Sequence, residues 1–475
     1  MTRCMNGIRI LSMLFLGFFF YNAGIAQDNP VVDSFQKYRV ASIRIIGIKH
    51  TKISIVEREL LFHIGDSLNQ TDIEKQLNES RFLLQNTNLF SEVELHADLD
   101  SFGAWNTHIK LREKLFIYPL PKFYLLDRNF NEWWYTFDAD LNRIIYGIQW
   151  THLNLTGRAD PLTIRIYNGF TRTLSISYAQ PNIDKKMKWG LAFGAGFTEN
   201  RVLSYKTGTD NRLQQLQSTE SLRETFAASA TLRHRNLLYN RSSLTLQLSH
   251  VKISDQVSDT LFNPNYLNSK GNALWFPDIS YSWQHLHVDN INFPLLGNAY
   301  GFGISKRGIG WKGNLNMLSL DANWKYYVPL KKQFFLQLQT AGQIKLPFKQ
   351  AYMNQRAFGY GDFYLSGLDR YVIDGVASVL LKTALSKKIW STQLQPPFRS
   401  HKIPTIPLGV YLRMFTHHGY SYLPDGNQYL MNNRWLYTAG IGLDLISLYD
   451  MRFGLDYSFN QFGEKGLFLQ WRNFF

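Results

Sequence analysis

The chain has 475 residues, of which 45% are hydrophobic and 15% are aromatic, and its formal net charge is +15. After the first 26 residues it has no run of about 20 apolar residues, which excludes a helical membrane span. Basic chains often bind nucleic acid, but no basic helix or base-stacking motif with a recognised spacing is present. The basic residues are scattered, which favours anionic lipid head groups or a polar lumen as their surroundings.

The first 26 residues are typical of a secretory signal peptide. Arg3 and Arg9 give a positive start, the apolar run ILSMLFLGFFFY follows, and residues 24–26 (GIA) are small enough for cleavage. The single cysteine, Cys4, lies in this segment. We therefore expect a mature protein without a disulfide, a thiol nucleophile or a cysteine-ligated metal.

Residues 38–114 mix strands and helices. Thr71 and Glu74 have the spacing of a capping box, which opens a helix. The predicted elements are, in chain order, a strand over 40–48, a helix over 53–62, a helix from 71, and strands over 91–99 and 107–114. The sequence thus predicts a small α+β domain with the order β-α-α-β-β.

This segment resembles a POTRA domain, the periplasmic module of the BamA-type outer-membrane assembly superfamily. The resemblance rests on the runs IRIIGIKHTKISIVEREL, GDSL and LLQNTNLFSEVEL in combination. It implies that an exposed strand edge receives an extended client protein as an added strand. The candidate edge is the strand over 91–99, with Ser91, Val93 and Leu95.

From residue 133 to residue 475 the sequence predicts strands and turns, preceded by a linker over 115–132. Apolar and polar residues alternate in segments of about ten residues, the length of a tilted membrane-crossing strand. Short connections largely alternate with long ones, including 199–223, 253–275 and 347–375. The pattern predicts an antiparallel transmembrane β-barrel of roughly 16 strands, whereas a soluble β-sandwich would have shorter strands.

The C-terminal end of the chain is strongly amphipathic. Residues 451–460 (MRFGLDYSFN) place apolar and polar side chains on opposite faces, and a second such segment follows. An amphipathic last strand that ends on an aromatic residue is typical of outer-membrane barrels. The resemblance implies a weak seam between the first and last strands, formed by Trp133, Tyr135 and Phe137 on one side and by Leu467, Leu469, Trp471 and Phe475 on the other.

The resemblance extends into the barrel, where GIQWTHLNLTGRAD and ISYAQPNI are similar to early strands of the superfamily. The connection over 347–375 stands where the superfamily has a long sixth outer loop, which folds into the lumen and carries an Arg-Gly-aromatic motif. We therefore expect its matching run to lie inside the barrel. This run consists of Leu365, Ser366, Gly367, Leu368, Asp369 and Arg370.

The matching run departs from the superfamily motif, because both the arginine before Gly367 and the aromatic residue after it are missing. Arg370 is the candidate replacement, with Asp444 and Asp456 on the inner wall as its partners, since a buried guanidinium needs acidic groups. The alternative is that Asp369 and Arg370 are ordinary polar residues of a plug-like loop.

The sequence predicts no catalytic residue, no cofactor and no metal site. His417 and His418 are adjacent, so on a strand their side chains point to opposite faces and cannot easily hold one ion. No Ser/His/Asp set or carboxylate pair is legible from the spacing.

The resemblance implies an outer-membrane protein assembly or translocation factor of a Gram-negative bacterium, with its N-terminal domain in the periplasm. The expected partners are outer-membrane lipids and lipopolysaccharide, unfolded outer-membrane or secreted client proteins, and periplasmic chaperones or lipoproteins, but no nucleic acid. A passive pore or transporter, which needs a free lumen, and a lipid-modifying barrel enzyme are the alternatives. The sequence identifies neither the client nor the choice between insertion and secretion.

Overall fold

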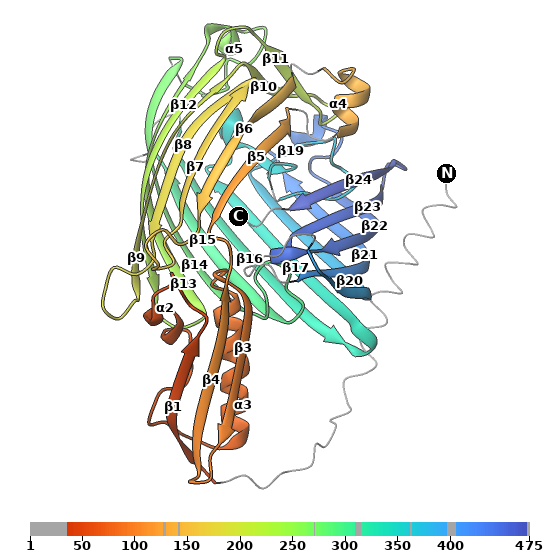
Figure 1. The fold of residues 1–475 in the computed structure, drawn as a ribbon. Helices are drawn as coiled ribbons and strands as arrows, with labels where there is room; N and C mark the ends of the chain where they lie inside the picture. The colour runs from red at the N-terminus through yellow and green to blue at the C-terminus, as the bar shows by residue number, and fades with distance from the viewer. Residues whose placement is uncertain are drawn as a thin grey trace.

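The computed structural model describes residues 36–126, 130–140, 143–269, 271–308, 315–361, 363–396 and 405–472. A small N-terminal domain stands at one end of a curved 16-stranded sheet that forms a barrel (Figure 1). We call this end proximal, and the opposite end, which carries the long connections, distal. No described helix is long and apolar enough to cross a membrane. The predicted signal peptide over 1–26 lies outside the described residues.

The N-terminal domain is a four-stranded sheet with the order β2-β1-β4-β3. Strands β1 and β4 are parallel, and the other neighbours are antiparallel. The predicted order β-α-α-β-β is confirmed, with the two-residue strand β2 in addition. The elements are β1 (Tyr38–Ile46), α2 (Ile53–Glu57), β2 (Ser67–Leu68), α3 (Gln70–Gln85), β3 (Phe90–Leu99) and β4 (Ala104–Glu113).

Helix α3 begins with Gln70, one residue before the predicted start at residue 71. The Asn69 side chain caps it by accepting a hydrogen bond from the backbone N–H of Asp72 at 2.7 Å. Ile73, Leu77 and Leu84 fall on one face of α3 and are buried against the sheet. Burying side chains of this size stabilises a fold by about 1.5–3 kcal/mol each, so this single apolar face holds the domain together.

The barrel sheet is antiparallel, and its strands follow one another in chain order from β5 to β24. The predicted number of strands is confirmed. They are β5 (Ile117–Leu125), β6 (Ile144–His152), β7 (Leu162–Gly169), β8 (Thr171–Gln180), β9 (Trp189–Asn200), β12 (Arg223–Arg235), β13 (Asn240–Ile253), β14 (Ala273–Val288), β15 (Gly297–Arg307), β16 (Met317–Leu330), β17 (Phe334–Leu346), β20 (Ala377–Leu394), β21 (Ile406–Tyr422), β22 (Trp435–Ile446), β23 (Arg452–Asn460) and β24 (Lys465–Arg472).

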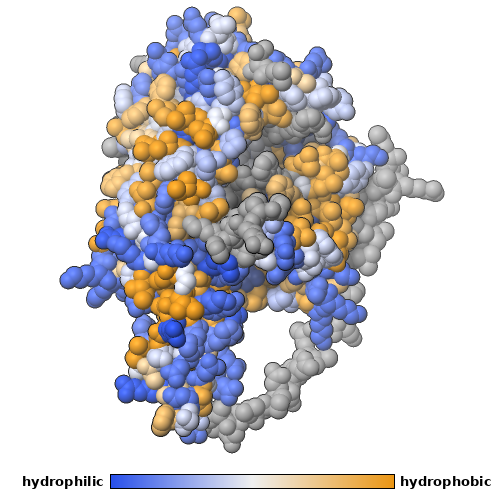
Figure 2. All heavy atoms as spheres, viewed as in Figure 1, coloured by the Kyte–Doolittle hydropathy of each residue, from blue (hydrophilic) through white to orange (hydrophobic). Residues whose placement is uncertain are grey.

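The two faces of the barrel wall differ in polarity. In β23, Asp456 and Ser458 are buried on the inner face, whereas Leu455 and Tyr457 are exposed on the outer face. Apolar side chains cover much of the outside of the wall, and hydrophilic ones gather at the distal connections (Figure 2). The outward apolar residues include Ile166, Leu174, Ile176, Phe193, Leu244, Leu246, Leu248, Ile279, Phe302, Ile304, Ile441, Leu443, Leu467 and Leu469.

The expected linker over 115–132 and the expected first strand from Trp133 are wrong. Strand β5 lies inside that linker and pairs with β6 over its whole length. Residues Phe130–Thr136 instead form the helix α4 at the distal end (Figure 1). The backbone of Asp138 and Ala139, just after α4, has positive φ, which is incompatible with an extended strand. Alternation over eight residues was too short to distinguish the two structures.

The long distal connections share a hydrophobic core of their own. All three predicted long connections contribute to it, with Leu203 and Leu222 from the first, Val257 and Tyr266 from the second, and Ala351 from the third. Their elements are β10 (Val202–Thr207), β11 (Leu213–Gln217), α5 (Asp255–Ser258), η3 (Tyr352–Asn354), β18 (Arg356–Phe358), β19 (Ile373–Asp374) and η4 (Gly426–Gln428), and the short helices η2 (Lys331–Gln333) and η5 (Leu448–Asp450) lie in proximal turns.

Candidate functional site

Strands β5 and β24 form a seam in the barrel wall. They are the two ends of the 16-stranded sheet, and no ladder between them is present among the described residues. A strand edge of this kind exposes backbone N–H and C=O groups that another strand can use.

The edge of β5 that faces the seam carries two prolines. The backbone hydrogen bonds Leu153 N to Phe116 O and Leu126 N to Arg143 O, each 2.8 Å, show that the even-numbered residues of β5 bond to β6. Hydrogen-bonding direction alternates along an antiparallel strand, so the odd-numbered residues point to the seam. Two of them, Pro119 and Pro121, have no N–H to donate. The seam edge of β5 therefore cannot support a continuous ladder.

The residues predicted to form the seam are only partly in place. Trp133, Tyr135 and Phe137 are not seam residues, because the first two lie in α4 and all three follow β5 in the chain. Leu467 and Leu469 lie in β24 and are exposed on its outer face. Trp471 also lies in β24, opposite Phe453, and Phe475 lies outside the described residues. The sequence does contain a signal for this edge strand, because Pro119 and Pro121 alternate with Tyr118, Leu120 and Lys122 and so fall on one edge of the strand.

The run Leu365–Arg370 lies inside the barrel, as expected. The backbone N–H of Ser366 donates to Nδ1 of His417 on β21 at 3.2 Å, and the side chain of Asn460 on β23 donates to the carbonyl oxygen of Gly367 at 2.9 Å. Leu365 and Leu368 are buried in a cluster that includes the wall residue Leu380. The loop therefore fills the lumen against β20 to β23.

Gly367 brings the backbone of this run close to the wall. Its φ is +91°, and a Cβ there would lie 3.2 Å from Oγ of Ser458. A glycine is required because a side chain would be strained by both the backbone and the wall. Its N–H donates to Oδ2 of Asp369 at 2.8 Å, so Asp369 stabilises the turn.

The inner-wall acids Asp444 and Asp456 pair with arginines of the wall, and the predicted pairing with Arg370 is wrong. Arg413 on β21 contacts Asp444 at 2.9 Å and Asp456 at 2.6 Å, and Arg452 contacts Asp444 at 2.8 Å. Arg370 is exposed. The two acids were identified correctly, but the cation that neutralises them belongs to the barrel.

Gly442 makes the long reach of Arg413 possible. The residue opposite Arg413 on β22 is Gly442, and the residue opposite Gly442 on β23 is Asp456. A Cβ at Gly442 would lie 2.3 Å from Oδ1 of Asp456 and 3.1 Å from Nη2 of Arg413. The guanidinium thus crosses one strand through the space that the glycine leaves.

The distal connections close over the loop. Asp374 accepts hydrogen bonds from Thr207 at 2.6 Å and from Tyr360 at 2.9 Å, and its backbone oxygen accepts one from Asn432 at 2.6 Å. Burial raises the pKa of Asp374, although the hydrogen bonds from Thr207 and Tyr360 act against this. These contacts join the connections after β9, β17 and β21 into one distal cap. Asn211 reinforces it with hydrogen bonds to the backbone of Val372 and Met431.

Strand β3, the predicted client edge, lies at the edge of the N-terminal sheet. Val93 and Leu95 point into the domain core, and Ser91 donates to the carbonyl oxygen of Arg112 on β4. The outward side chains form charge pairs with β4, Glu92 with Arg112 and Glu94 with Lys110. The free backbone edge is in place for strand addition, whereas client binding itself stays a prediction.

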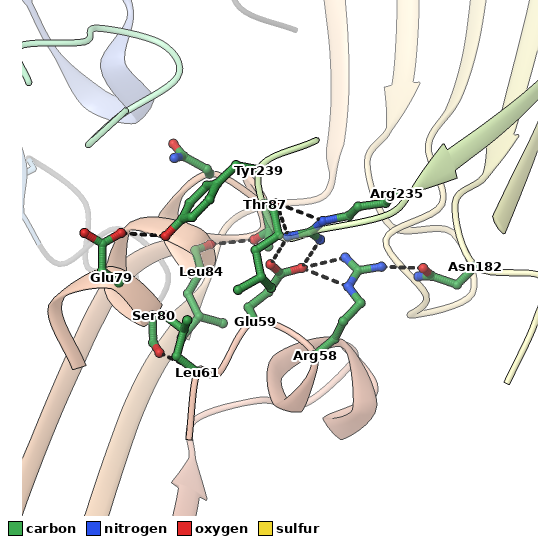
Figure 3. Close-up of polar contacts among 12 residues, drawn as sticks. Arg58, Glu59, Leu61, Glu79, Ser80, Leu84, Thr87, Asn182, Arg235 and Tyr239 are labelled. Atoms are coloured by element: carbon green, nitrogen blue, oxygen red, sulfur yellow. Dashed lines mark hydrogen bonds and ion pairs between the residues drawn. The ribbon is translucent and has the colours of Figure 1, made fainter. Parts of the chain in front are cut away.

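An ion pair connects the N-terminal domain to the barrel wall (Figure 3). Glu59 follows α2 and accepts two hydrogen bonds of 2.7 Å from Arg235 at the proximal end of β12. Arg58 donates to the same carboxylate and to the side chain of Asn182 in the turn between β8 and β9. Burial alone would raise the pKa of Glu59, but the two guanidinium groups outweigh it and lower the pKa below 4.5.

Further contacts fix the orientation of the domain. Asn86, after α3, donates to the carbonyl oxygen of Val288 and accepts from the N–H of Ile291, both at 2.8 Å. Glu79 accepts a hydrogen bond of 2.6 Å from Tyr239 (Figure 3). Thr51 accepts one from Asn154 in the first proximal turn. The domain is thus attached to several proximal turns at once.

The described residues contain no group of three or more His, Cys, Asp or Glu side chains that could hold a metal ion. His417 is buried on the inner face of β21, while the neighbouring His418 points the other way and contacts Thr416. The fold and this site define a β-barrel of the outer-membrane type, with an α+β domain at its proximal end and a loop in its lumen.

Comparison with known proteins assigns the family. The Omp85 superfamily domain matches residues 154–379, and the POTRA family, described as surface antigen variable number repeat, matches residues 38–110. The fold is similar to the structure of BamA from Haemophilus ducreyi lacking POTRA domains 1–3, with 16% identity, 91% of this chain and 83% of that chain covered, and a TM-score of 0.51. For the structure of CdiB from Escherichia coli, the identity is 11%, 94% of this chain and 92% of that chain are covered, and the TM-score is 0.51.

No curated protein matches the sequence. The chain belongs to the Omp85 superfamily and carries a POTRA domain, and its fold is similar to that of BamA and CdiB. The resemblance stated from the sequence is therefore confirmed for the family and the fold.

Proposed function

We propose that this protein is an outer-membrane assembly factor that inserts client proteins sideways through the seam between β5 and β24. The seam carries the proposal, because the described strands of the wall pair continuously except between β5 and β24, and the β5 edge is interrupted by Pro119 and Pro121. In this proposal the barrel lies in the outer membrane of a Gram-negative bacterium, and the POTRA domain lies in the periplasm.

The POTRA domain captures the client, and an edge strand of the barrel then pairs with it and guides its folding. An extended client segment adds to the free edge of β3 and is passed to the seam. There it pairs with β24, since that edge has no proline, whereas β5 lacks two donors. The client thus enters the membrane from the edge of β24.

Insertion is favoured over export through the lumen, and over a passive pore, by the contents of the barrel. Residues 365–370 lie in the lumen against β21 and β23, and the distal cap around Asp374 joins the connections at the distal end. Both obstacles would have to move before a chain or a solute could pass. A lipid-modifying enzyme has no comparable observation in its favour. Lipopolysaccharide, chaperones and lipoproteins remain proposed partners.

The test restores the missing donors in β5. Pro119→Ile with Pro121→Val adds two N–H groups to the seam edge, so the seam pairs more fully and client levels in the outer membrane fall. Pro277→Val, in the middle strand β14, is the control. Each variant is expressed in a depletion strain, and quantitative proteomics measures the outer membrane and the culture medium.

The pattern of loss identifies the activity. Broad loss of barrel proteins on depletion means a general insertase, and loss of a few surface proteins means a dedicated one. Wild-type client levels in the double-proline variant would contradict templating at the seam. If depletion leaves client levels unchanged but alters the uptake of small solutes, the protein is a pore and not an assembly factor.

A further inference from the structure

A cavity of about 450 Å³ lies at the proximal mouth of the barrel, between the POTRA domain and the inner wall. Leu83, Asn86 and Thr87 line it from the end of α3, and Ser243 and Ser282 line it from the inner faces of β13 and β14. The cavity thus lies beside the domain that captures the client in the proposed function.

The lining of the cavity is strongly basic. Among the described residues that line it there are five cations and one carboxylate, namely Arg58, Lys188, Arg233, Arg235, Arg241 and Glu59. Lys188 is exposed, so the four arginines account for the charge inside. One carboxylate cannot neutralise four guanidinium groups.

The ladder between β12 and β13 concentrates this charge. Arg235 lies directly opposite Arg241, and Arg233 lies two residues before Arg235 on the same inner face. Like charges at opposite positions of a sheet destabilise it. Glu59 contacts Arg235 and Arg58 through four hydrogen bonds, so its charge is already used (Figure 3). Within the described part of the chain, Arg233 and Arg241 are therefore left without a carboxylate partner.

We propose that this cavity binds an acidic segment of an extended polypeptide client, through Arg233 and Arg241. Planar guanidinium groups suit carboxylates, and the hydroxyl groups of Ser243 and Ser282 add hydrogen-bond partners beside them. Lipid head groups are not the ligand, because these side chains face the lumen and not the outside of the wall. The inference rests on the proposed function and adds a chemical preference to it.

The test uses the full mature chain in lipid nanodiscs and a labelled peptide, Gly-Ser-Asp-Ser-Asp-Ser-Gly, amidated at its C-terminus. Its isosteric partner has Asn in place of both Asp residues. Fluorescence anisotropy should show about tenfold tighter binding of the Asp peptide, equivalent to about 1.4 kcal/mol, and a loss of that preference at high salt. The variant Arg233→Gln/Arg241→Gln should bind both peptides equally weakly.

Two controls separate binding from folding. Arg165→Gln removes one charge from the inner face of β7, outside the cavity, and should keep the preference for the Asp peptide. The double variant should be at least as stable as the wild type, because it removes repulsion and leaves the Glu59–Arg235 pair intact. A purely structural role for the two arginines would instead lower the stability.

Equal binding of the two peptides by the wild type would overturn the proposal, as would an unchanged preference in the double variant. Inorganic phosphate should compete with the Asp peptide. Phosphate binding without peptide binding would mean a small-ion site and would also overturn it. If depletion still lowers client levels while the wild type shows no preference for the Asp peptide, the assembly function is supported and this site is not part of it.

Discussion

At the scale of single residues, the inner wall holds a buried charge network in place of the loop arginine of the superfamily. Arg413 has 9% of its side chain exposed, and Asp456 has none. Removing one member leaves the others charged in a site with little water, which costs more than the pair contributes. The network therefore fixes the pairing of β21, β22 and β23.

We expect Arg413→Gln to lower the free energy of unfolding by about 3–5 kcal/mol, because Asp456 loses its ion pair and Asp444 keeps only Arg452. Urea unfolding of the barrel, followed by its heat-dependent gel mobility, measures the change. Arg370→Gln is the matched control, and it should cost less than about 0.5 kcal/mol because the side chain is exposed. A loss below about 1 kcal/mol in Arg413→Gln would contradict a structural role for the network.

The sequence was sufficient to select Asp444 and Asp456, since both fall on the polar face of amphipathic strands. It was not sufficient to select Arg413. That choice depends on register, which places Gly442 between Arg413 and Asp456. Register is set by the whole sheet and is not visible in any one strand.

At the scale of elements, the amphipathic strands were predictable and the first strand was not. In β23 the alternation is uninterrupted, so both its faces were assigned correctly. The segment that forms β5 was predicted to be part of a linker, and its two prolines are unusual inside a sheet. The strand exists because only its free edge loses donors, while its other edge pairs fully with β6.

The free edge of β3 leads to a second prediction. A photocrosslinking amino acid at Glu94, on β3, should capture client proteins in cells, because an added strand would lie beside it. The same group at His108, on β4, is the control and should capture far less, because β4 pairs with β1 on one side and with β3 on the other. Equal capture at both positions would mean that clients bind the face of the sheet and not its edge.

At the scale of the whole molecule, the POTRA domain and the barrel behave as one body through contacts at separate turns. Glu59 holds the wall at β12, and Asn86 holds the turn after β14. A domain held at only one point would rotate, whereas these contacts keep the edge of β3 at a fixed position below the barrel.

This docking should weaken in acid. The pKa of Glu59 is lower in the folded protein than its ordinary value of 4.5, so its contribution is complete above that value and is lost as the pH falls below it. Spin labels at Phe102→Cys and Leu261→Cys, which are 94% and 85% exposed, report the distance between the domain and the distal cap. We expect a narrow distance distribution near pH 6 and a broad one once the pH has fallen through the lowered pKa of Glu59.

Glu59→Gln should give a broad distribution at both pH values, because it removes the charge that titrates. Glu74→Gln, on the exposed side of α3, should behave like the wild type. A distribution that stays narrow in Glu59→Gln would show that Asn86 and the other contacts are enough to hold the domain.

Under the proposed insertion of clients at the seam, the two prolines of β5 explain how the protein avoids inhibition by its own product. If both seam edges could form complete ladders, an inserted client strand would be hydrogen-bonded on both sides as strongly as a strand inside a finished sheet. The first client would then occupy the seam permanently. Because the β5 edge has gaps at Pro119 and Pro121, a client barrel is held firmly on one side only. Its own first and last strands can then pair with each other and displace the template, which frees the protein for another round.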